Sequence, residues 1–321
     1  MTDSTPRPRP PIPVGLSDQA RQYLAITDPF GDARPPTDLK DVDGWLSYID
    51  SRNVLLVKTL AARLPAELPL VRGEFDIDGV RTYVFRRRDV PEGPETPIYL
   101  DIHGGGLVMG GGEACQVMAS AGALGRDMIT WAVDYRMPPL HPYPTALDDC
   151  LAAYRRLLDE RAPEDVFVGG ASAGGNLAAA LMLRARDEGL AMPAALVLLS
   201  PEVDLTESGD SFHTNLGIDH VLGSLMSTNL LYANGHDLSE PYLSPLFGDV
   251  AGFPPTFLQT GTRDLFLSNT VRMHRKLRSA GVEADLHVFE AMPHGGLGGA
   301  PEDMEIGLEV QRFLTGHRRQ R

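Results

Sequence analysis

A serine surrounded by glycines lies in the segment "VFVGGASAGGNLAAAL", residues 166–181. Its first apolar residues, 166–168, predict the end of a short buried strand, and the alanine- and leucine-rich stretch 176–186 predicts a helix. Ser172 then lies at a strand-to-helix corner within the pattern G-x-S-x-G, residues 170–174, which exposes a nucleophilic hydroxyl. A plain glycine turn also fits five residues, whereas a phosphate-binding loop needs a lysine that does not follow.

A nucleophilic serine needs a base, because a neutral hydroxyl attacks carbonyl groups poorly. Of the nine histidines, His294 is the strongest candidate, since "FEAMPHGG" follows an apolar strand near the C-terminus and glycines leave space around the ring. Ser172 and His294 also keep the chain order serine, acid, histidine that accompanies this corner.

The acid that would orient the imidazole is Asp264, which lies in the loop after the strand in "FLQTGTRDLFL". Asp264 also fits a helix N-cap, and Arg263 beside it fits a salt-bridge partner. The rival acids Asp285 and Glu290 are expected within the following strand, where they are poorly placed for a loop role.

Attack on a carbonyl creates an oxyanion, which backbone N–H groups must meet. One candidate is the amide of Ala173, the residue after the serine. The others lie in "HGGG", residues 103–106, which follows the strand that ends at Ile102. A glycine turn that serves tight packing is the alternative, but two glycine loops at adjacent strand ends favour an oxyanion site.

The composition describes a globular protein of one α/β domain with a cap: 321 residues, 43% hydrophobic and 22% charged. A net charge of −14 disfavours nucleic acid and anionic membranes as partners, and no apolar run is long enough to cross a bilayer. Cys115 and Cys150 are too few for a disulfide framework, and the N-terminus lacks a secretory signal. We therefore expect a cytoplasmic protein.

The pattern along the chain predicts a disordered, proline-rich tail at 1–14 and N-terminal cap helices within 15–66, at 18–26 and 39–64, separated by a Pro-, Gly- and Asp-rich loop. The catalytic domain is expected at 67–321. It opens with a hairpin that turns at Asp78-Gly79.

From there strands and helices alternate, including helices at 143–158 and 269–280. Such alternation predicts a mostly parallel central sheet flanked by helices on both faces, with function at the carboxyl ends of the strands. The looser stretch at about 205–240 is expected to form a second cap segment.

Five segments in this order resemble the hormone-sensitive-lipase-like branch of the α/β-hydrolases, in particular its bacterial esterases and monoterpene lactone hydrolases, over residues 98–294. They are "HGGGLVMGG", "VDYRMPPLHPYPTALDD", "GGASAGGNLAAAL", "SPLFGDVAGFPPTFLQTGTRDLFL" and "MPHGG". The resemblance implies an α/β-hydrolase fold with a helical cap. Its functional residues fall on Ser172, Asp264 and His294 as triad, with Gly105, Gly106 and Ala173 as oxyanion donors.

Two residues depart from the family pattern. Ala171 stands where many relatives carry Asp or Thr, so a supporting hydrogen bond is lost. Glu202 stands where relatives often have an apolar or aromatic residue; it either disfavours acidic substrates or points to solvent, and the second interpretation is slightly favoured. Together with His103, Glu202 is a candidate for the substrate pocket.

The predicted function is that of a serine carboxylic-ester hydrolase for short- to medium-chain esters or small lactones, acting through an acyl-enzyme without a metal or organic cofactor. The family often forms dimers, so a homodimer is also expected. The first alternative is a non-catalytic small-molecule-binding protein of the same fold. A nucleotide-binding α/β domain, the remaining alternative, has only the fold in its favour.

Overall fold

The computed structural model describes residues 9–26 and 34–319. The predicted disordered tail at 1–14 lies largely outside the described residues, and so does most of the predicted loop between the two N-terminal helices. Residues 9–13, at the other end of that tail, form neither helix nor strand.

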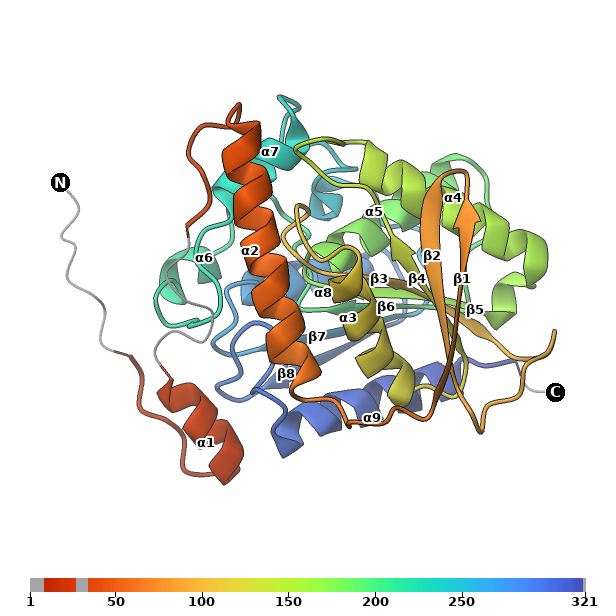
Figure 1. Cartoon of the computed structure of the whole chain (residues 1–321), viewed down its shortest axis with the longest axis horizontal. Coiled ribbons are helices and arrows are strands. Elements are labelled where there is room, and N and C mark those ends of the chain that lie inside the picture. Colours follow the sequence, from red (N-terminus) through yellow and green to blue (C-terminus); the bar gives the residue numbers. More distant parts are fainter. Residues whose placement is uncertain (1–8, 27–33, 320–321) are drawn as a thin grey trace.

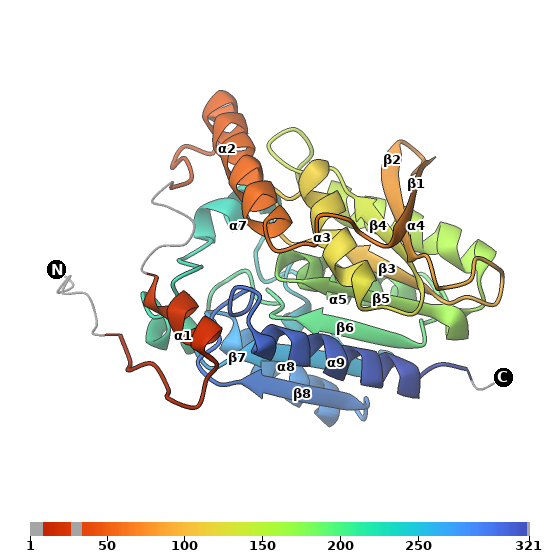
Figure 2. The same cartoon turned by 60° about the horizontal axis from the view of Figure 1, so that its bottom comes forward.

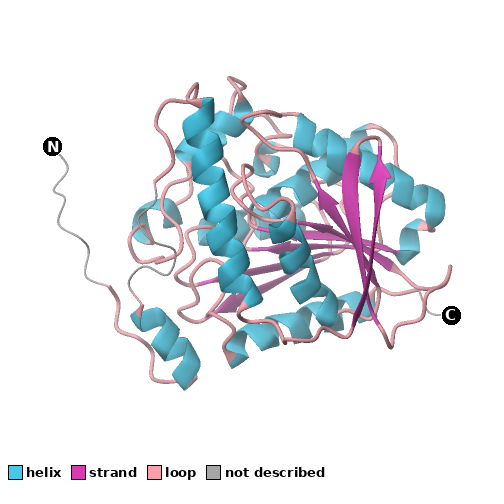
Figure 3. Ribbon diagram, in the orientation of Figure 1, coloured by secondary structure: helices cyan, strands magenta, loops and turns pink. Residues whose placement is uncertain are grey.

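One eight-stranded sheet forms the centre of the molecule, in the order β1-β2-β4-β3-β5-β6-β7-β8 (Figures 1 and 3). β1 pairs with β2, and β2 with β4, in antiparallel fashion, while all other neighbours are parallel. This arrangement confirms the predicted α/β-hydrolase class of architecture. The strands are β1 (Leu70–Ile77), β2 (Val80–Arg87), β3 (Ile98–Ile102), β4 (Ile129–Asp134), β5 (Val166–Ala171), β6 (Ala195–Leu199), β7 (Thr256–Gly261) and β8 (Ala284–Phe289).

Helices cover both faces of the sheet, and Figure 2 shows α9 lying across one of them. The α-helices are α1 (Asp18–Ala25), α2 (Val42–Ala61), α3 (Glu113–Leu124), α4 (Thr145–Glu160), α5 (Ala173–Asp187), α6 (Ser211–Thr214), α7 (Met226–Ala233), α8 (Leu267–Ser279) and α9 (Pro301–Gly316). Short 3₁₀ turns lie at Pro163–Asp165 and Pro245–Phe247. No helix in the described part of the chain has the length and apolarity to span a membrane.

The alternation of side chains along each strand sorts the core into two layers. Tyr99, Phe167 and Phe257 point to one face and pack with Phe313 and Leu314 of α9. Their sequence neighbours point to the other face, where apolar side chains of α4, α5 and α8 cover them. The central strands are buried on both faces, which explains their nearly continuous apolar composition.

The predicted elements agree with the structure except at the serine corner. The hairpin turns at Asp78-Gly79, and α1, α2, α4 and α8 lie where helices are predicted, with ends shifted by a few residues. However, residues 166–168, predicted as the end of a strand, are the first half of β5, which continues through two glycines to Ala171, and α5 begins at Ala173 rather than at residue 176. The glycine-rich composition made the end of β5 and the start of α5 hard to predict, because these glycines serve close packing rather than a turn.

The N-terminal helices pack against the loops at the carboxyl ends of the strands. α2 lies against α3 (Figure 1), and its Trp45 forms an apolar cluster with Val108 and with Leu231 of α7. α1 packs on the loop that follows β8, where Ala20 and Leu24 contact an apolar group that includes Met292. Ser17, the N-cap of α1, also donates to Glu302 of α9 from its amide and its hydroxyl.

Replacement of Leu177 by alanine should destabilise the protein by about 2–5 kcal/mol, because this side chain of α5 is fully buried against the sheet and leaves a cavity. Urea unfolding followed by circular dichroism measures the change. Leu230→Ala is the matched control, since Leu230 of α7 is 41% exposed and should lose much less stability. Equal losses in the two variants would contradict this packing scheme.

Candidate active site

Ser172 occupies a sharp corner between β5 and α5. Its backbone has φ 57° and ψ −122°, a conformation that side chains rarely adopt, so the surrounding structure must hold it. Its amide donates to the carbonyl of Leu199 at 2.9 Å, and its carbonyl accepts from the amides of Asn176 and Glu202 at 3.1 Å each. The corner is therefore fixed to the neighbouring strand β6 and to the first turn of α5.

Close backbone contact explains two of the glycines. A Cβ atom on Gly174 would lie 1.9 Å from the carbonyl oxygen of Ile102, so only glycine lets α5 approach the end of β3. A Cβ atom on Gly104 would lie 2.9 Å from the carbonyl oxygen of Ala171 and 3.4 Å from the Cβ atom of Ser172. The loop after β3 and the serine corner are thus in direct contact, as the pairing of Ile102 with Gly170 requires.

Asp264 and His294 come from the loops after β7 and β8, and their side chains meet. The distance between Asp264 Oδ1 and His294 Nδ1 is 3.2 Å, and the two groups are 0% and 8% exposed. Asp264 Oδ1 also accepts from the amide of Phe266, and its Oδ2 accepts from the hydroxyl of Thr260 at 2.8 Å. The ring of Phe266 lies edge-on to the imidazole at 4.9 Å. The carboxylate is therefore fixed in place and directed at one ring nitrogen.

The electrostatics of this pair favour the charged forms. Burial by itself would raise the pKa of Asp264, but the charge and hydrogen bond of His294 lower it below its ordinary value. Burial likewise acts to lower the pKa of His294, yet the charge and hydrogen bond of Asp264, helped by Asp219 and Glu202, raise it above 6.5. Asp264 consequently stabilises a protonated His294.

Two other roles of Asp264, a helix N-cap and a salt bridge with Arg263, do not fit its surroundings. Asp264 is not the N-cap of α8, which is Phe266, and the guanidinium of Arg263 donates to the carbonyls of Pro10 and Pro11 instead. Of the rival acids, Asp285 lies in β8 as predicted. Glu290 does not, because the strand ends one residue before it.

The glycine loop after β3 presents backbone amides beside the serine corner. Gly105 and Gly106 have φ values of 131° and 58°, which favour glycine. In residues 9–26 and 34–319 no protein acceptor meets the amides of Gly105, Gly106 or Ala173. The side chain of Asn53, from α2, accepts from the amide of Gly110 at 2.8 Å and supports the loop.

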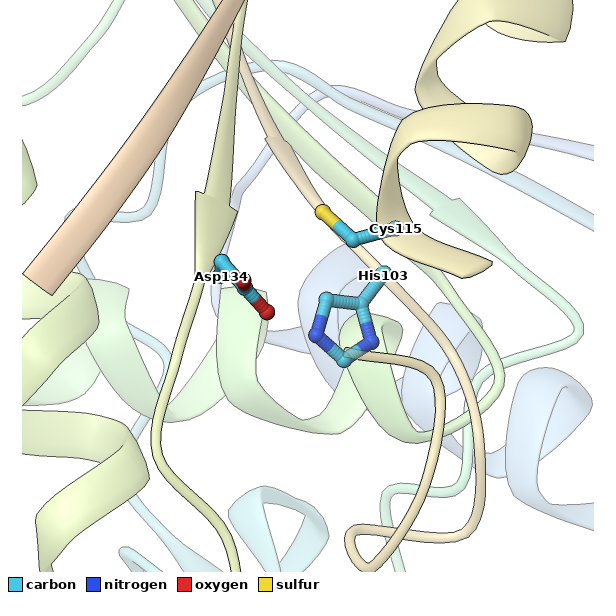
Figure 4. Close-up of side chains that lie close together, drawn as sticks. All are labelled: His103, Cys115 and Asp134. Atoms are coloured by element: carbon cyan, nitrogen blue, oxygen red, sulfur yellow. The ribbon is translucent and has the colours of Figure 1, made fainter. Parts of the chain in front are cut away.

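His103 lies behind this loop, where its buried ring points towards Asp134 and Cys115 (Figure 4). Its Nδ1 is 2.9 Å from the carbonyl of Gly104, so Nδ1 carries the proton, and Nε2 meets no hydrogen-bond partner among the residues that the structure describes. The ring stacks on Tyr135, whose hydroxyl donates to the carbonyl of His103. These contacts indicate that His103 supports the glycine loop from behind.

One potential ligand atom from each of His103, Cys115 and Asp134 lies within 4.8 Å of the others, a spacing at which a metal ion could be held. Burial raises the pKa of the Cys115 thiol well above its usual range, which disfavours the thiolate that metals bind. Asp134 already accepts from the amide of Gly112 and the hydroxyl of Tyr83. The donor set therefore fits a metal ion poorly.

Glu202 does not point to solvent, and that interpretation of the sequence is wrong. The side chain is fully buried, and within the described part of the chain neither carboxyl oxygen meets a partner at hydrogen-bonding geometry. Its amide donates to the carbonyl of Ser172, and its carboxyl group, when ionised, raises the pKa of His294. Burial raises the pKa of Glu202 to about 8, and the group is therefore mostly uncharged at pH 7.

No sequence motif marks the residues that connect the loop of Asp264 to the loop of His294. Asp219, in the segment between β6 and α7, is 4% exposed and accepts from the amides of both Leu265 and His294. Asn215 donates to the carbonyl of Asp264. Their segment, "NLGIDH", carries no motif, so only the tertiary structure reveals their position.

Comparison with known proteins agrees with this geometry. Residues 99–297 match the family model described as the α/β hydrolase fold. An esterase of Acinetobacter venetianus is 32% identical over 201 residues, which are 61% of this chain and 66% of that protein. The crystal structure of an esterase named E25 superposes with a TM-score of 0.87 at 37% identity, covering 97% of this chain and 98% of that one.

A second solved structure, an esterase from the bacterial hormone-sensitive lipase family, superposes with a TM-score of 0.83 at 29% identity, covering 94% and 98% of the two chains. The chain belongs to the α/β-hydrolase fold family, in the group that holds the bacterial esterases related to hormone-sensitive lipase.

His294 should titrate above pH 6.5 in the free protein, because the Asp264 carboxylate outweighs the effect of burial. Its ring signals in two-dimensional ¹H–¹⁵N NMR spectra, recorded from pH 5 to 9, measure the pKa. In Asp264→Asn the pKa should fall below the wild-type value, since the charge that raises it is gone while burial remains. An unchanged His294 pKa in the variant would contradict the pairing.

Proposed function

We propose that this chain hydrolyses carboxylic esters with Ser172 as nucleophile, His294 as base and Asp264 as the acid that orients it. The observation that carries the proposal is the 3.2 Å contact between Asp264 and His294, formed by two loops at the sheet edge where the Ser172 corner also lies. Several of its relatives are named esterases, which supports the same enzyme class for this chain.

In the proposed reaction, the Nε2 atom of His294 takes the proton of the Ser172 hydroxyl as the oxygen attacks the ester carbonyl. Asp264 holds the proton on Nδ1, which leaves Nε2 free to act as base, and it stabilises the imidazolium that forms. His294 then gives the proton to the leaving alkoxide, and a water molecule repeats the sequence on the acyl-enzyme. No cofactor enters either half of the reaction.

The amides of Gly105, Gly106 and Ala173 are the proposed donors to the oxyanion. Three features support this role. No acceptor among the described residues meets these amides, the glycine loop touches the serine corner, and the Ala173 amide stands at the N-terminus of α5, where partial positive charge gathers. Loss of one such donor typically costs a factor of 10²–10³ in kcat. The loop after β3 therefore matters nearly as much as the serine.

The proposed substrates are short- to medium-chain esters or small lactones. The N-terminal helices and the segment at about 205–240 are proposed to form the cap, because α2 and α7 both pack on the glycine loop beside Ser172. Glu202 is the proposed pocket residue. Because it is mostly neutral at pH 7, it should repel acidic substrates only at higher pH.

A cytoplasmic location is proposed because both cysteines are reduced and buried. A homodimer is proposed from the family resemblance, and light scattering in solution tests it.

The Ser172→Ala variant should lose more than about 10⁴-fold in kcat and all labelling by a fluorophosphonate probe, because both need the nucleophilic hydroxyl. Labelled protein is read by mass spectrometry, and hydrolysis by release of p-nitrophenol from its acetate ester. Ser224→Ala is the control and should label normally, since the hydroxyl of Ser224 contacts Glu207 and the amide of Met226 rather than the proposed triad. A folded wild type that neither labels nor turns over would favour the non-catalytic binding protein.

Activity on p-nitrophenyl esters should be highest for acyl chains of about two to eight carbons and decline for longer chains, because the strongly negative protein, with its net charge of −14, is poorly suited to a lipid interface. Values of kcat/KM across the chain-length series, with small lactones beside them, measure the preference. A preference for emulsified long-chain esters would refute this substrate class.

A further inference from the structure

The acid and base of the proposed triad come from separate loops, after β7 and after β8. Strand pairing fixes where the loops begin, up to the pairing of Gly261 with Phe289, but Asp264 and His294 lie three and five residues beyond that pair. Three hydrogen bonds also join the loops directly, from the amides of Thr262, Arg263 and Ala291 to the Phe289 carbonyl, the Met292 carbonyl and the Thr262 hydroxyl, but they end before Asp264 and His294. A further constraint at these two residues themselves would secure their 3.2 Å contact. A misplacement of about 1 Å at such a contact can cost on the order of 10²-fold in rate.

Asp219 supplies such a constraint with one oxygen atom. Its Oδ2 accepts from the amide of Leu265, next to Asp264, at 2.9 Å and from the amide of His294 itself at 3.2 Å. One carboxylate oxygen thus bridges the two loops. The other oxygen, Oδ1, accepts from the amides of Val221 and Leu222 at 2.9 and 3.2 Å, which holds the carboxylate in its own segment.

Asn215, one turn earlier, reinforces the acid side of this bridge. Its side-chain amide donates to the carbonyl of Asp264 at 2.8 Å and to that of Thr262 at 3.2 Å, while its own carbonyl accepts from the amide of Asp219 at 2.9 Å. The segment therefore holds the acid loop by a donor and an acceptor. The base loop is held by Asp219.

We propose that Asp219 is a positioning residue for the ester hydrolase: its carboxylate fixes the acid loop against the base loop so that Asp264 meets His294. The inference rests on the proposed function. It gives the segment at about 205–240 a role in assembling the site besides covering it, because both Asn215 and Asp219 belong to it.

A charged Asp219 is unfavourable because it is buried and lies near the negative charge of Asp264; a neutral side chain would avoid both penalties. Asp264 and His294 from the two loops and Tyr23 from α1 are the titratable groups that interact with Asp219. Burial and the charge of Asp264 raise the pKa of Asp219 to about 6, although the imidazole and the backbone amides counteract them. In return, its negative charge raises the pKa of His294 and so stabilises the imidazolium formed during catalysis.

Asp219→Asn is the direct test in the full-length protein, with p-nitrophenyl acetate as substrate. We expect kcat to fall about 10- to 100-fold with little change in KM, because the amide replaces one acceptor and loosens the contact of the two loops. The acid limb of kcat/KM should also move to lower pH, since the loss of a negative charge lowers the pKa of His294. Hydrogen exchange at the Leu265 and His294 amides should accelerate.

Two further variants separate positioning from general stability. Asp219→Glu keeps the charge, so its acid limb should stay at the wild-type pH even where kcat falls; it also serves if the asparagine variant does not fold. Asp204→Asn is the matched control, because Asp204 is equally buried but binds Thr206, Ser208 and Arg272 rather than the two loops. It should lower the melting temperature while kcat and the pH profile remain those of the wild type.

The proposal is overturned if folded Asp219→Asn, or Asp219→Glu in its place, keeps wild-type kcat and wild-type exchange at the two amides. It is also overturned if activity falls only in proportion to the unfolded fraction, with an unshifted acid limb. Neither result resembles a failure of the proposed function, in which the wild type itself would show no turnover and no labelling of Ser172.

Discussion

The backbone at Ser172 is the constraint on which the rest of the structure depends. A non-glycine residue at φ 57° is unfavourable by itself and persists only where neighbours hold it. Here β5 ends at Ala171 and α5 begins at Ala173, so the serine has no room to relax. The ends of β3 and β6 enclose the corner, and glycine is needed where α5 and the loop after β3 approach it.

The strand order then determines which loops can share a site. Because β3, β5, β6, β7 and β8 are parallel neighbours, their carboxyl ends lie along one edge of the sheet. Each contributes one part of the proposed site: the glycine-loop amides after β3, Ser172 after β5, Glu202 after β6, Asp264 after β7 and His294 after β8. This sharing of one edge is why residues far apart in the sequence can act together.

The helices and loops outside the sheet also hold the loops of the proposed site in position. α2 supports the glycine loop through Asn53 and Trp45, α1 packs on the base loop, and the segment with Asn215 and Asp219 connects the acid loop to the base loop. The glycine loop and the loops of Asp264 and His294 are therefore held by contacts on the side away from the sheet.

The sequence by itself determined the fold class, the hairpin and the candidate residues Ser172, Asp264 and His294, because these follow from local patterns of apolar residues, glycines and chain order. It did not determine the burial of Glu202, the placement of His103 behind the loop, or the bridge made by Asp219. Those depend on which distant backbone atoms come within hydrogen-bonding distance. Only the tertiary structure decides such distances, because buried acids and exposed acids look alike in a sequence.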